Sequence, residues 1–153
     1  STVKTSMNQL KKTDLVPFNI LNNSLMVMLA HIIYPSIDSK VATYSKKINE
    51  TILRKKFMFK GLILSDDISM KAINEDLKTK VKLCYNGGCD VILYCQGSLE
   101  EMKEIYSFVN PIKKKQLNFF FNKKKKILTK KKKHDKFKTK LIEFGLIKDA
   151  LKS

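Results

Sequence analysis

The sequence has few cysteines, and they are not arranged for a disulfide framework or a metal site. Cys84, Cys89 and Cys95 are the only three, an odd number within a 12-residue window. No Cys-x-x-Cys pair or neighbouring histidine supplies the ligand spacing of a zinc site. We therefore predict buried free thiols in a reducing compartment, with no metal and no cofactor.

The sequence also lacks a long apolar run. No stretch approaches the roughly 18 residues that a membrane-spanning helix needs. The first residues, STVKTSMNQLKKTD, do not contain the apolar core of a secretory signal. These features predict a cytoplasmic protein without a transmembrane segment.

Acidic residues are scarce and unevenly distributed. The 153 residues include 31 Lys and Arg but 14 Asp and Glu, which gives a formal net charge of +17. Residues 111–153 hold 16 of the basic residues and 3 of the acids, so most of the excess charge lies there. We predict one α/β domain over 1–110, long enough to bury a core, and a Lys-rich extension over 111–153.

Two interpretations of the Lys-rich extension remain open. Its segment KKKQLNFFFNKKKKILTKKKKHDKFKTK (113–140) has the composition of a solvated tail, helical or disordered. It also has the composition of a patch for RNA, DNA or an anionic membrane, with Phe119–Phe121 as anchors. Lysine runs attract polyanions without selecting one, which favours the first interpretation. Apolar residues over 141–151 predict a final amphipathic helix that covers exposed surface of the body.

Three apolar runs predict buried strands over 25–30, 61–65 and 90–95. Helical spacing, a Ser98–Glu101 capping box and the stops at Gly87-Gly88 and Pro111 predict helices between and after them. A short helix over 14–21 precedes the first strand, and the later helices are predicted over 43–56, 74–85 and 98–109. The order is that of parallel βαβ units, although three strands do not close a barrel and leave both outer edges bare.

The central strand ends at two adjacent carboxylates, Asp66 and Asp67, in KGLILSDDISMKA (60–72). Carboxylates at the C-terminal end of a parallel strand are typical of active sites in α/β folds. An Asp before a helical run is also a favoured N-cap, so the pair has a structural alternative.

Four segments resemble the bacterial β-N-acetylhexosaminidases of glycoside hydrolase family 3, in the same order and at similar spacing. They are DLVPF (14–18), MLAHIIYPSIDSKVATYS (28–45), LRKKFMFKGLILSDDISMKA (53–72) and GGCDVIL (87–93). The resemblance covers residues 4–109 and implies part of a TIM (β/α)₈ barrel, namely its last three βα units. It also implies release of terminal N-acetylglucosamine from peptidoglycan fragments during cytoplasmic cell-wall recycling.

The resemblance places the catalytic nucleophile on Asp66. A retaining glycosidase needs an ionised carboxylate that attacks the anomeric carbon. On this alignment Asp67 caps the following helix. His31, at the end of the preceding strand, either binds the sugar or is a packed, hydrogen-bonded histidine.

The sequence departs from the family at the acid/base. The family uses an Asp–His pair on a mobile loop, preceded by Lys-His-Phe-Pro-Gly-His-Gly, but this sequence has only His31 and His134 and no Pro-Gly-His run. We therefore expect a fragment that starts after that loop and is inactive or impaired alone, its missing barrel half supplied by another chain. The alternative is a decayed barrel fragment that acts only as a basic polyanion-binding protein.

Overall fold

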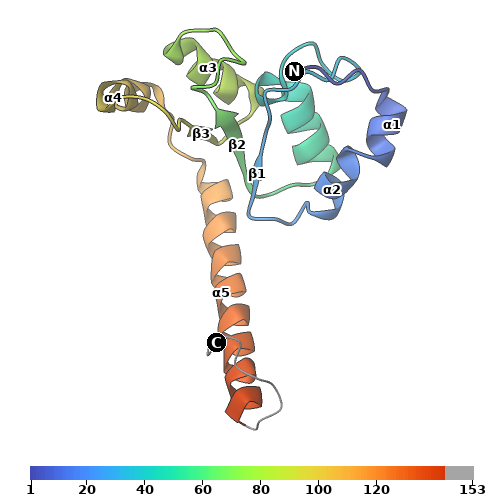
Figure 1. The fold of residues 1–153 in the computed structure, drawn as a ribbon, viewed down its shortest axis with the longest axis vertical. Coiled ribbons are helices and arrows are strands. Elements are labelled where there is room, and N and C mark those ends of the chain that lie inside the picture. The colour runs from blue at the N-terminus through green and yellow to red at the C-terminus, as the bar shows by residue number, and fades with distance from the viewer. Residues whose placement is uncertain (144–153) are drawn as a thin grey trace.

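The fold is a small parallel sheet with helices packed around it and one long helix extending from the body (Figure 1). The computed structural model describes the backbone of residues 1–143 and the side chains of residues 1–129. In chain order the elements are α1 (Met7–Lys12), α2 (Leu15–Ile20), β1 (Met26–Met28), η1 (Ala42–Tyr44), η2 (Lys47–Lys56), β2 (Leu62–Asp67), α3 (Leu77–Gly87), β3 (Val91–Leu93), α4 (Leu99–Phe108) and α5 (Lys114–Glu143).

The three strands form one sheet in the order β1-β2-β3, and both pairings are parallel. This confirms the predicted βαβ topology. Met26 pairs with Leu62 and Met28 with Leu64, so β1 and β2 begin level with each other. Parallel neighbours need a crossover, which η1 and η2 provide between β1 and β2, and α3 provides between β2 and β3.

The hydrophobic core lies between the sheet and the crossover helices. Ile63 of β2 is fully buried, as are Val81 and Cys84 of α3, and η2 contributes Ile48, Ile52 and Leu53. Burying an aliphatic side chain of this size stabilises the fold by about 1.5–3 kcal/mol. The helices are therefore fixed against this face of the sheet by their apolar stripes.

The opposite face of the sheet is partly open. Met26 and Met28 of β1 are 48% and 58% exposed. They share this face with Leu62 and Leu64, because paired residues of parallel strands point the same way. The pairing of β2 with β3 is irregular between Leu64 and Asp67, and Asp66 lies within this irregular stretch, where it is half-buried.

The helix predicted over 43–56 differs from the α-helix that the spacing suggested. A 3₁₀ turn, η1, is followed by η2, a π-helix in which the Phe57 amide donates to the carbonyl of Ile52, five residues earlier (2.9 Å). The buried Asn49 side chain donates to the carbonyls of Ala42 (3.3 Å) and Gly87 (2.9 Å). Asn49 thus ties η2 to both neighbouring segments.

The helix after β2 begins later than predicted, and it corrects the capping role given to Asp66 or Asp67. Asp76 is the N-cap of α3, and its carboxylate accepts a hydrogen bond from the Thr79 amide (2.9 Å). Asp67 instead uses its carboxylate within the turn that follows β2. The end of the helix is as predicted, because Gly88 adopts the left-handed conformation at φ 107°.

The third strand is shorter than predicted, and the prediction that Cys95 is a buried thiol is wrong. β3 ends at Leu93, beyond an irregular register with β2, so Cys95 lies outside the sheet and is exposed rather than buried. Cys84 and Cys89 are buried free thiols, as expected. The capping box of Ser98 and Glu101 is present and opens α4.

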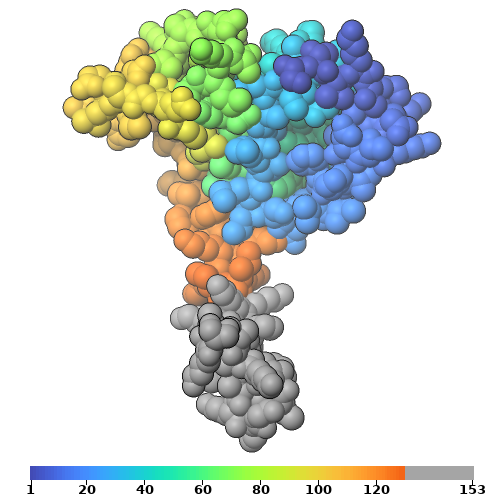
Figure 2. All heavy atoms as spheres, in the orientation of Figure 1, coloured from blue at the N-terminus to red at the C-terminus, as the bar shows by residue number. Residues whose placement is uncertain are grey.

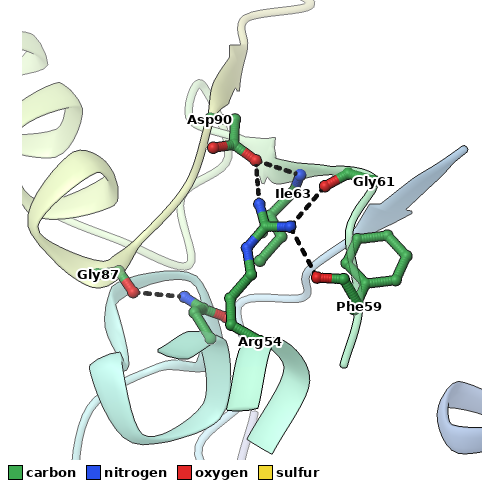
Figure 3. Close-up of polar contacts among 7 residues, drawn as sticks. Arg54, Phe59, Gly61, Ile63, Gly87 and Asp90 are labelled. Atoms are coloured by element: carbon green, nitrogen blue, oxygen red, sulfur yellow. Dashed lines mark hydrogen bonds and ion pairs between the residues drawn. The ribbon is translucent and has the colours of Figure 1, made fainter. Parts of the chain in front are cut away.

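A partly buried ion pair joins η2 to the starts of β2 and β3 (Figure 3). The Arg54 guanidinium pairs with Asp90 and also donates to the carbonyls of Phe59 (3.1 Å) and Gly61 (2.7 Å). The Asp90 carboxylate also accepts the Ile63 amide at 2.8 Å. The side chains are only 21% and 7% exposed, so each charge depends on the other for its stabilisation.

Gly61 is required where β1 and β2 begin. A Cβ at this position would lie 2.4 Å from the carbonyl oxygen of Leu25 and 2.6 Å from that of Ser24. We predict that Gly61→Ala lowers the free energy of unfolding by about 1–3 kcal/mol, because the backbone must move apart. Urea denaturation measures it, with exposed Lys60→Ala as the control, expected within about 0.5 kcal/mol of wild type. Equal midpoints for the two variants would contradict the prediction.

The Lys-rich segment is helical in the described backbone, where α5 runs from Lys114 to Glu143. Leu117, Phe119 and Phe120 near its start are half-buried, whereas Phe121 is 56% exposed. Most of the amphipathic helix predicted over 141–151 lies outside the described residues. None of the helices in the described part of the chain is long and apolar enough to cross a bilayer.

Candidate active site

Asp66 lies at the C-terminal end of the central strand, where the sequence predicted it. It is the second-last residue of β2 and is half-buried. One carboxylate oxygen, Oδ1, accepts a hydrogen bond from the Asp67 amide at 2.9 Å. Among residues 1–129 this is the only hydrogen bond that the carboxylate accepts, so the second oxygen is free to meet a ligand.

Asp67 connects the ends of β2 and β3. Its Oδ1 accepts the amides of Ser69 (2.9 Å) and Cys95 (3.0 Å), and its Oδ2 accepts the Ser69 hydroxyl (2.6 Å). Burial raises the pKa of Asp67, but these hydrogen bonds and the nearby His31 outweigh it, so the pKa is lower than usual. Asp67 is therefore ionised at neutral pH and committed to structure.

His31 follows β1 and contacts Asp67 at the end of β2. The side chain is 4% exposed, with Nε2 3.0 Å from the Asp67 carbonyl oxygen and Nδ1 3.1 Å from the Thr43 hydroxyl. These are the contacts of a packed, hydrogen-bonded histidine. Sugar binding by His31 stays a prediction.

Lys80 is a buried charged residue near the site that the sequence analysis did not single out. It is 9% exposed on α3, and its ammonium donates to the Ile68 carbonyl at 3.0 Å, directly after the carboxylate pair. Its spacing was a usable signal, because Lys80 lies three residues after Leu77 and four before Cys84, on the core side of the helix. Ser69 had a signal too, since Asp-x-Ser is a common turn pattern.

An apolar cavity of about 100 Å³ lies beside β1 rather than at Asp66. It is lined by core residues that include Met28, Leu29 and Ile48, with Tyr34 and Asp14 among its polar groups. Burial, and secondarily the Asp14 charge, raise the pKa of Tyr34, which keeps its phenol neutral. Asp66 does not line this cavity, so the candidate site is an open strand end and the cavity is a gap in packing.

The buried thiols and the acids do not form a metal site in the described residues. A hydrogen bond with Cys84, together with burial, raises the pKa of Cys89 far above its usual range, so the thiol stays protonated. Residues 1–129 contain no cluster of three or more His, Cys, Asp or Glu that could hold a metal ion. At the end of the central strand, the Asp66 carboxylate is the group with a free oxygen for chemistry.

A family model decides the ancestry of this arrangement. The model described as "Glycosyl hydrolase family 3 N terminal domain" matches residues 1–129, which is most of the chain. The chain belongs to glycosyl hydrolase family 3. This confirms the resemblance that the sequence motifs showed.

Curated relatives agree with the family match. The chain is 36% identical over 105 residues to a beta-hexosaminidase of Neisseria meningitidis, an alignment that covers 65% of this chain and 29% of the relative. A beta-hexosaminidase of Stenotrophomonas maltophilia is 38% identical over 98 residues, covering 61% and 29%. The chain therefore spans about three tenths of the length of these relatives.

Solved structures of the family share the fold. Native NagZ from Neisseria gonorrhoeae superposes with a TM-score of 0.68 at 29% identity, covering 80% of this chain and 35% of that one. The beta-N-acetylglucosaminidase from Thermotoga maritima gives 0.63 at 36% identity, covering 70% and 25%. The Neisseria enzyme has also been solved with N-trifluoroacetyl-D-glucosamine bound. The parallel sheet seen here is thus consistent with part of a family 3 barrel.

Proposed function

We propose that residues 1–110 form the last βα units of a retaining β-N-acetylhexosaminidase barrel, with Asp66 as its nucleophile. The observation that carries the proposal is the half-buried carboxylate of Asp66 at the C-terminal end of a parallel strand in a family 3 chain. The substrate class comes from the relatives, which are beta-hexosaminidases and a beta-N-acetylglucosaminidase. Terminal N-acetylglucosamine on peptidoglycan fragments in the cytoplasm is the substrate we propose.

The geometry of Asp66 suits a nucleophile. The Asp67 amide holds Oδ1 at 2.9 Å and fixes the carboxylate plane, while the other oxygen remains available. That oxygen forms a bond to the anomeric carbon as the bond to the leaving oxygen breaks, and the electron pair departs with the leaving group. Water then attacks the anomeric carbon of the glycosyl-enzyme and gives its proton to the acid/base. The bond to Asp66 breaks with its electron pair, which restores the carboxylate.

Proton transfer to the leaving oxygen requires a group beyond those described at this site. The sequence contains two histidines, and the ring of His31 is buried and engaged at both nitrogens. General acid catalysis contributes about 10²–10⁴-fold to rate. We propose that the acid/base and the sugar-binding residues come from barrel strands outside residues 1–153, so that residues 1–153 assayed alone are impaired.

Covalent trapping tests the nucleophile without the acid. An activated aryl or fluoro N-acetylglucosaminide has a leaving group that departs with little protonation, so the chain is expected to form a trace of glycosyl-enzyme. Intact mass and peptide mapping should place the added sugar on Asp66. The label should be absent from Asp66→Asn and present in Asp67→Asn. Labelling of another residue, or of Asp66→Asn, would refute the assignment.

The Lys-rich extension, residues 111–153, supports a second candidate function, the binding of nucleic acid. Helix α5 extends away from the body (Figures 1 and 2). Its described part carries the exposed lysines Lys124, Lys125 and Lys126. Lysines on a projecting helix reach phosphates on a nucleic-acid strand without distorting the fold. This candidate is independent of Asp66 and makes a different prediction.

We predict that binding of a fluorescent oligonucleotide falls steeply with salt. A site that contacts about 6–10 phosphates loses about 10³–10⁵-fold in affinity between 50 and 200 mM salt, because bound cations are released. Fluorescence anisotropy across a salt series measures the slope, and deletion of 111–153 should abolish binding. Unchanged binding by the truncated chain would contradict the prediction, as would binding to anionic vesicles but not to the oligonucleotide.

A further inference from the structure

The carboxylate pair is held by a chain of hydrogen bonds that begins at η1. The Thr43 hydroxyl lies 3.2 Å from the Ala30 carbonyl oxygen and 3.1 Å from Nδ1 of His31. The other ring nitrogen, Nε2, lies 3.0 Å from the carbonyl oxygen of Asp67. Thr43 is fully buried and His31 is 4% exposed, so water does not replace these contacts.

The hydrogen positions follow from what each group can donate. A carbonyl oxygen only accepts, so Nε2 of His31 carries a proton and donates it to Asp67. In the neutral ring, Nδ1 then accepts the hydroxyl proton of Thr43. In the charged ring, Nδ1 donates to Thr43, and the hydroxyl proton turns to the carbonyl of Ala30. The Ala30 carbonyl receives the Thr43 proton only when the ring is charged, whereas the bond from Nε2 to Asp67 is the same in both states.

The residue that receives this bond, Asp67, directly follows the proposed nucleophile. The Asp67 carbonyl also accepts the Met70 amide (3.2 Å), and the Asp67 amide donates to Asp66 (2.9 Å). On the far side of the same turn, the Ile68 amide donates to Leu93 of β3 (2.9 Å). His31, after β1, and Leu93 of β3 thus hold the two sides of the Asp67–Ile68 peptide, one residue beyond the Asp67 amide that contacts the Asp66 carboxylate.

We propose that His31 is a positioning residue for Asp66, acting through the Asp67 carbonyl, with Thr43 making the contact independent of the charge of His31. The effect on catalysis rests on the proposed function of Asp66. The effect of His31 on the turn at Asp67 does not depend on that function. The charged group of β2 that faces His31 is the Asp67 carboxylate, and the two interact electrostatically. The hydrogen bonds of this carboxylate come from Ser69 and Cys95.

A matched pair of variants isolates the Nε2 contact. Glutamine at position 31 carries an amide at about the reach of Nε2, so His31→Gln keeps a donor for Asp67. Asparagine ends near Nδ1, so His31→Asn loses that donor but stays polar. Amide hydrogen exchange by NMR at Ser69 and Met70 reports on the turn, and exchange at Ile63, bound to Asp90, reports on the fold as a whole.

We expect His31→Asn to speed exchange at Ser69 and Met70 by at least tenfold relative to Ile63, and His31→Gln to restore most of the protection. The ring ¹⁵N shifts of the wild type should show the proton on Nε2 when the ring is neutral. Unchanged exchange in His31→Asn, equal exchange in the two variants, or a neutral ring protonated on Nδ1 would overturn the proposal.

The same variants are then compared in the trapping experiment, which separates the two ideas. Labelling of Asp66 should slow at least tenfold in His31→Asn and recover in His31→Gln. If the wild-type chain is not labelled, the nucleophile assignment fails while the exchange data still decide the structural contact. If labelling is the same in both variants although their exchange differs, His31 holds the turn but does not position Asp66, and the proposal fails.

Discussion

Replacing Asp66 by asparagine is expected to abolish hydrolysis by a barrel completed around this chain. Asparagine keeps the size of the side chain and an oxygen that accepts the Asp67 amide, but it is neutral and does not attack the anomeric carbon. Removal of a catalytic nucleophile costs about 10⁴–10⁶-fold in kcat. We therefore expect Asp66→Asn to lose at least about 10⁴-fold of the activity of the completed barrel.

The measurement is an aryl N-acetylglucosaminide assay on three samples: the chain alone, the chain with a polypeptide carrying the other strands and the Asp–His loop of a family 3 β-hexosaminidase, and that pair with Asp66→Asn. The chain alone should show no detectable turnover, because the proton donor and sugar contacts are absent from the assay. Asp67→Asn is the matched control and should lose less activity, since the side-chain oxygen of asparagine still accepts hydrogen bonds from the amides of Ser69 and Cys95. Turnover by the chain alone that survives Asp66→Asn would refute the assignment.

Loss of the Arg54–Asp90 pair is expected to have the largest effect on stability. Arg54→Ala leaves the Asp90 carboxylate, which is 7% exposed, without its counter-charge and leaves the Phe59 and Gly61 carbonyls without a donor (Figure 3). Breaking one side of a buried pair costs about 3–5 kcal/mol. A domain of this size has about 5–15 kcal/mol in total, so the variant should be marginally folded.

Urea denaturation followed by circular dichroism measures this loss. Arg54→Lys keeps the charge but not the planar fork that reaches two carbonyls and a carboxylate, so we expect partial rescue. The double variant Arg54→Ala, Asp90→Ala should lose less than the sum of the single losses, because neither charge is left buried alone. A loss below about 1 kcal/mol for Arg54→Ala, the value for exposed pairs, would contradict the prediction.

The sequence predicted the strands and the position of Asp66 because both depend on local pattern. The apolar run over 62–64 and the turn residues that follow it place Asp66 at a strand end whatever the rest of the fold does. The parallel pairing followed from the alternation of strands and helices, and the Gly88 stop of α3 from its backbone freedom. Each of these features depends on residues that are close together in the sequence.

Other features escaped prediction because they depend on distant neighbours. Spacings of four and five residues both put Ile48, Ile52 and Leu53 on one side, so the pattern does not distinguish an α-helix from the π-helix η2. At the end of β3 the Leu93 amide donates to the Ser65 hydroxyl of β2 (2.9 Å), a contact between residues 28 positions apart that a short sequence window around Cys95 does not contain. Such cross-strand bonds are invisible before the fold is known.

The sheet has a consequence for how long the protein survives in a cell. In the described part of the chain, no further strand pairs with the outer edge of β1 or β3, and the two methionines of β1 remain exposed. β1 and β3 are each three residues long, and such short edge strands are poor templates for aggregation. Chaperones and proteases act on chains with open edges and exposed apolar side chains. A segment that pairs with these edges would then slow degradation, because it would cover the groups that chaperones and proteases recognise.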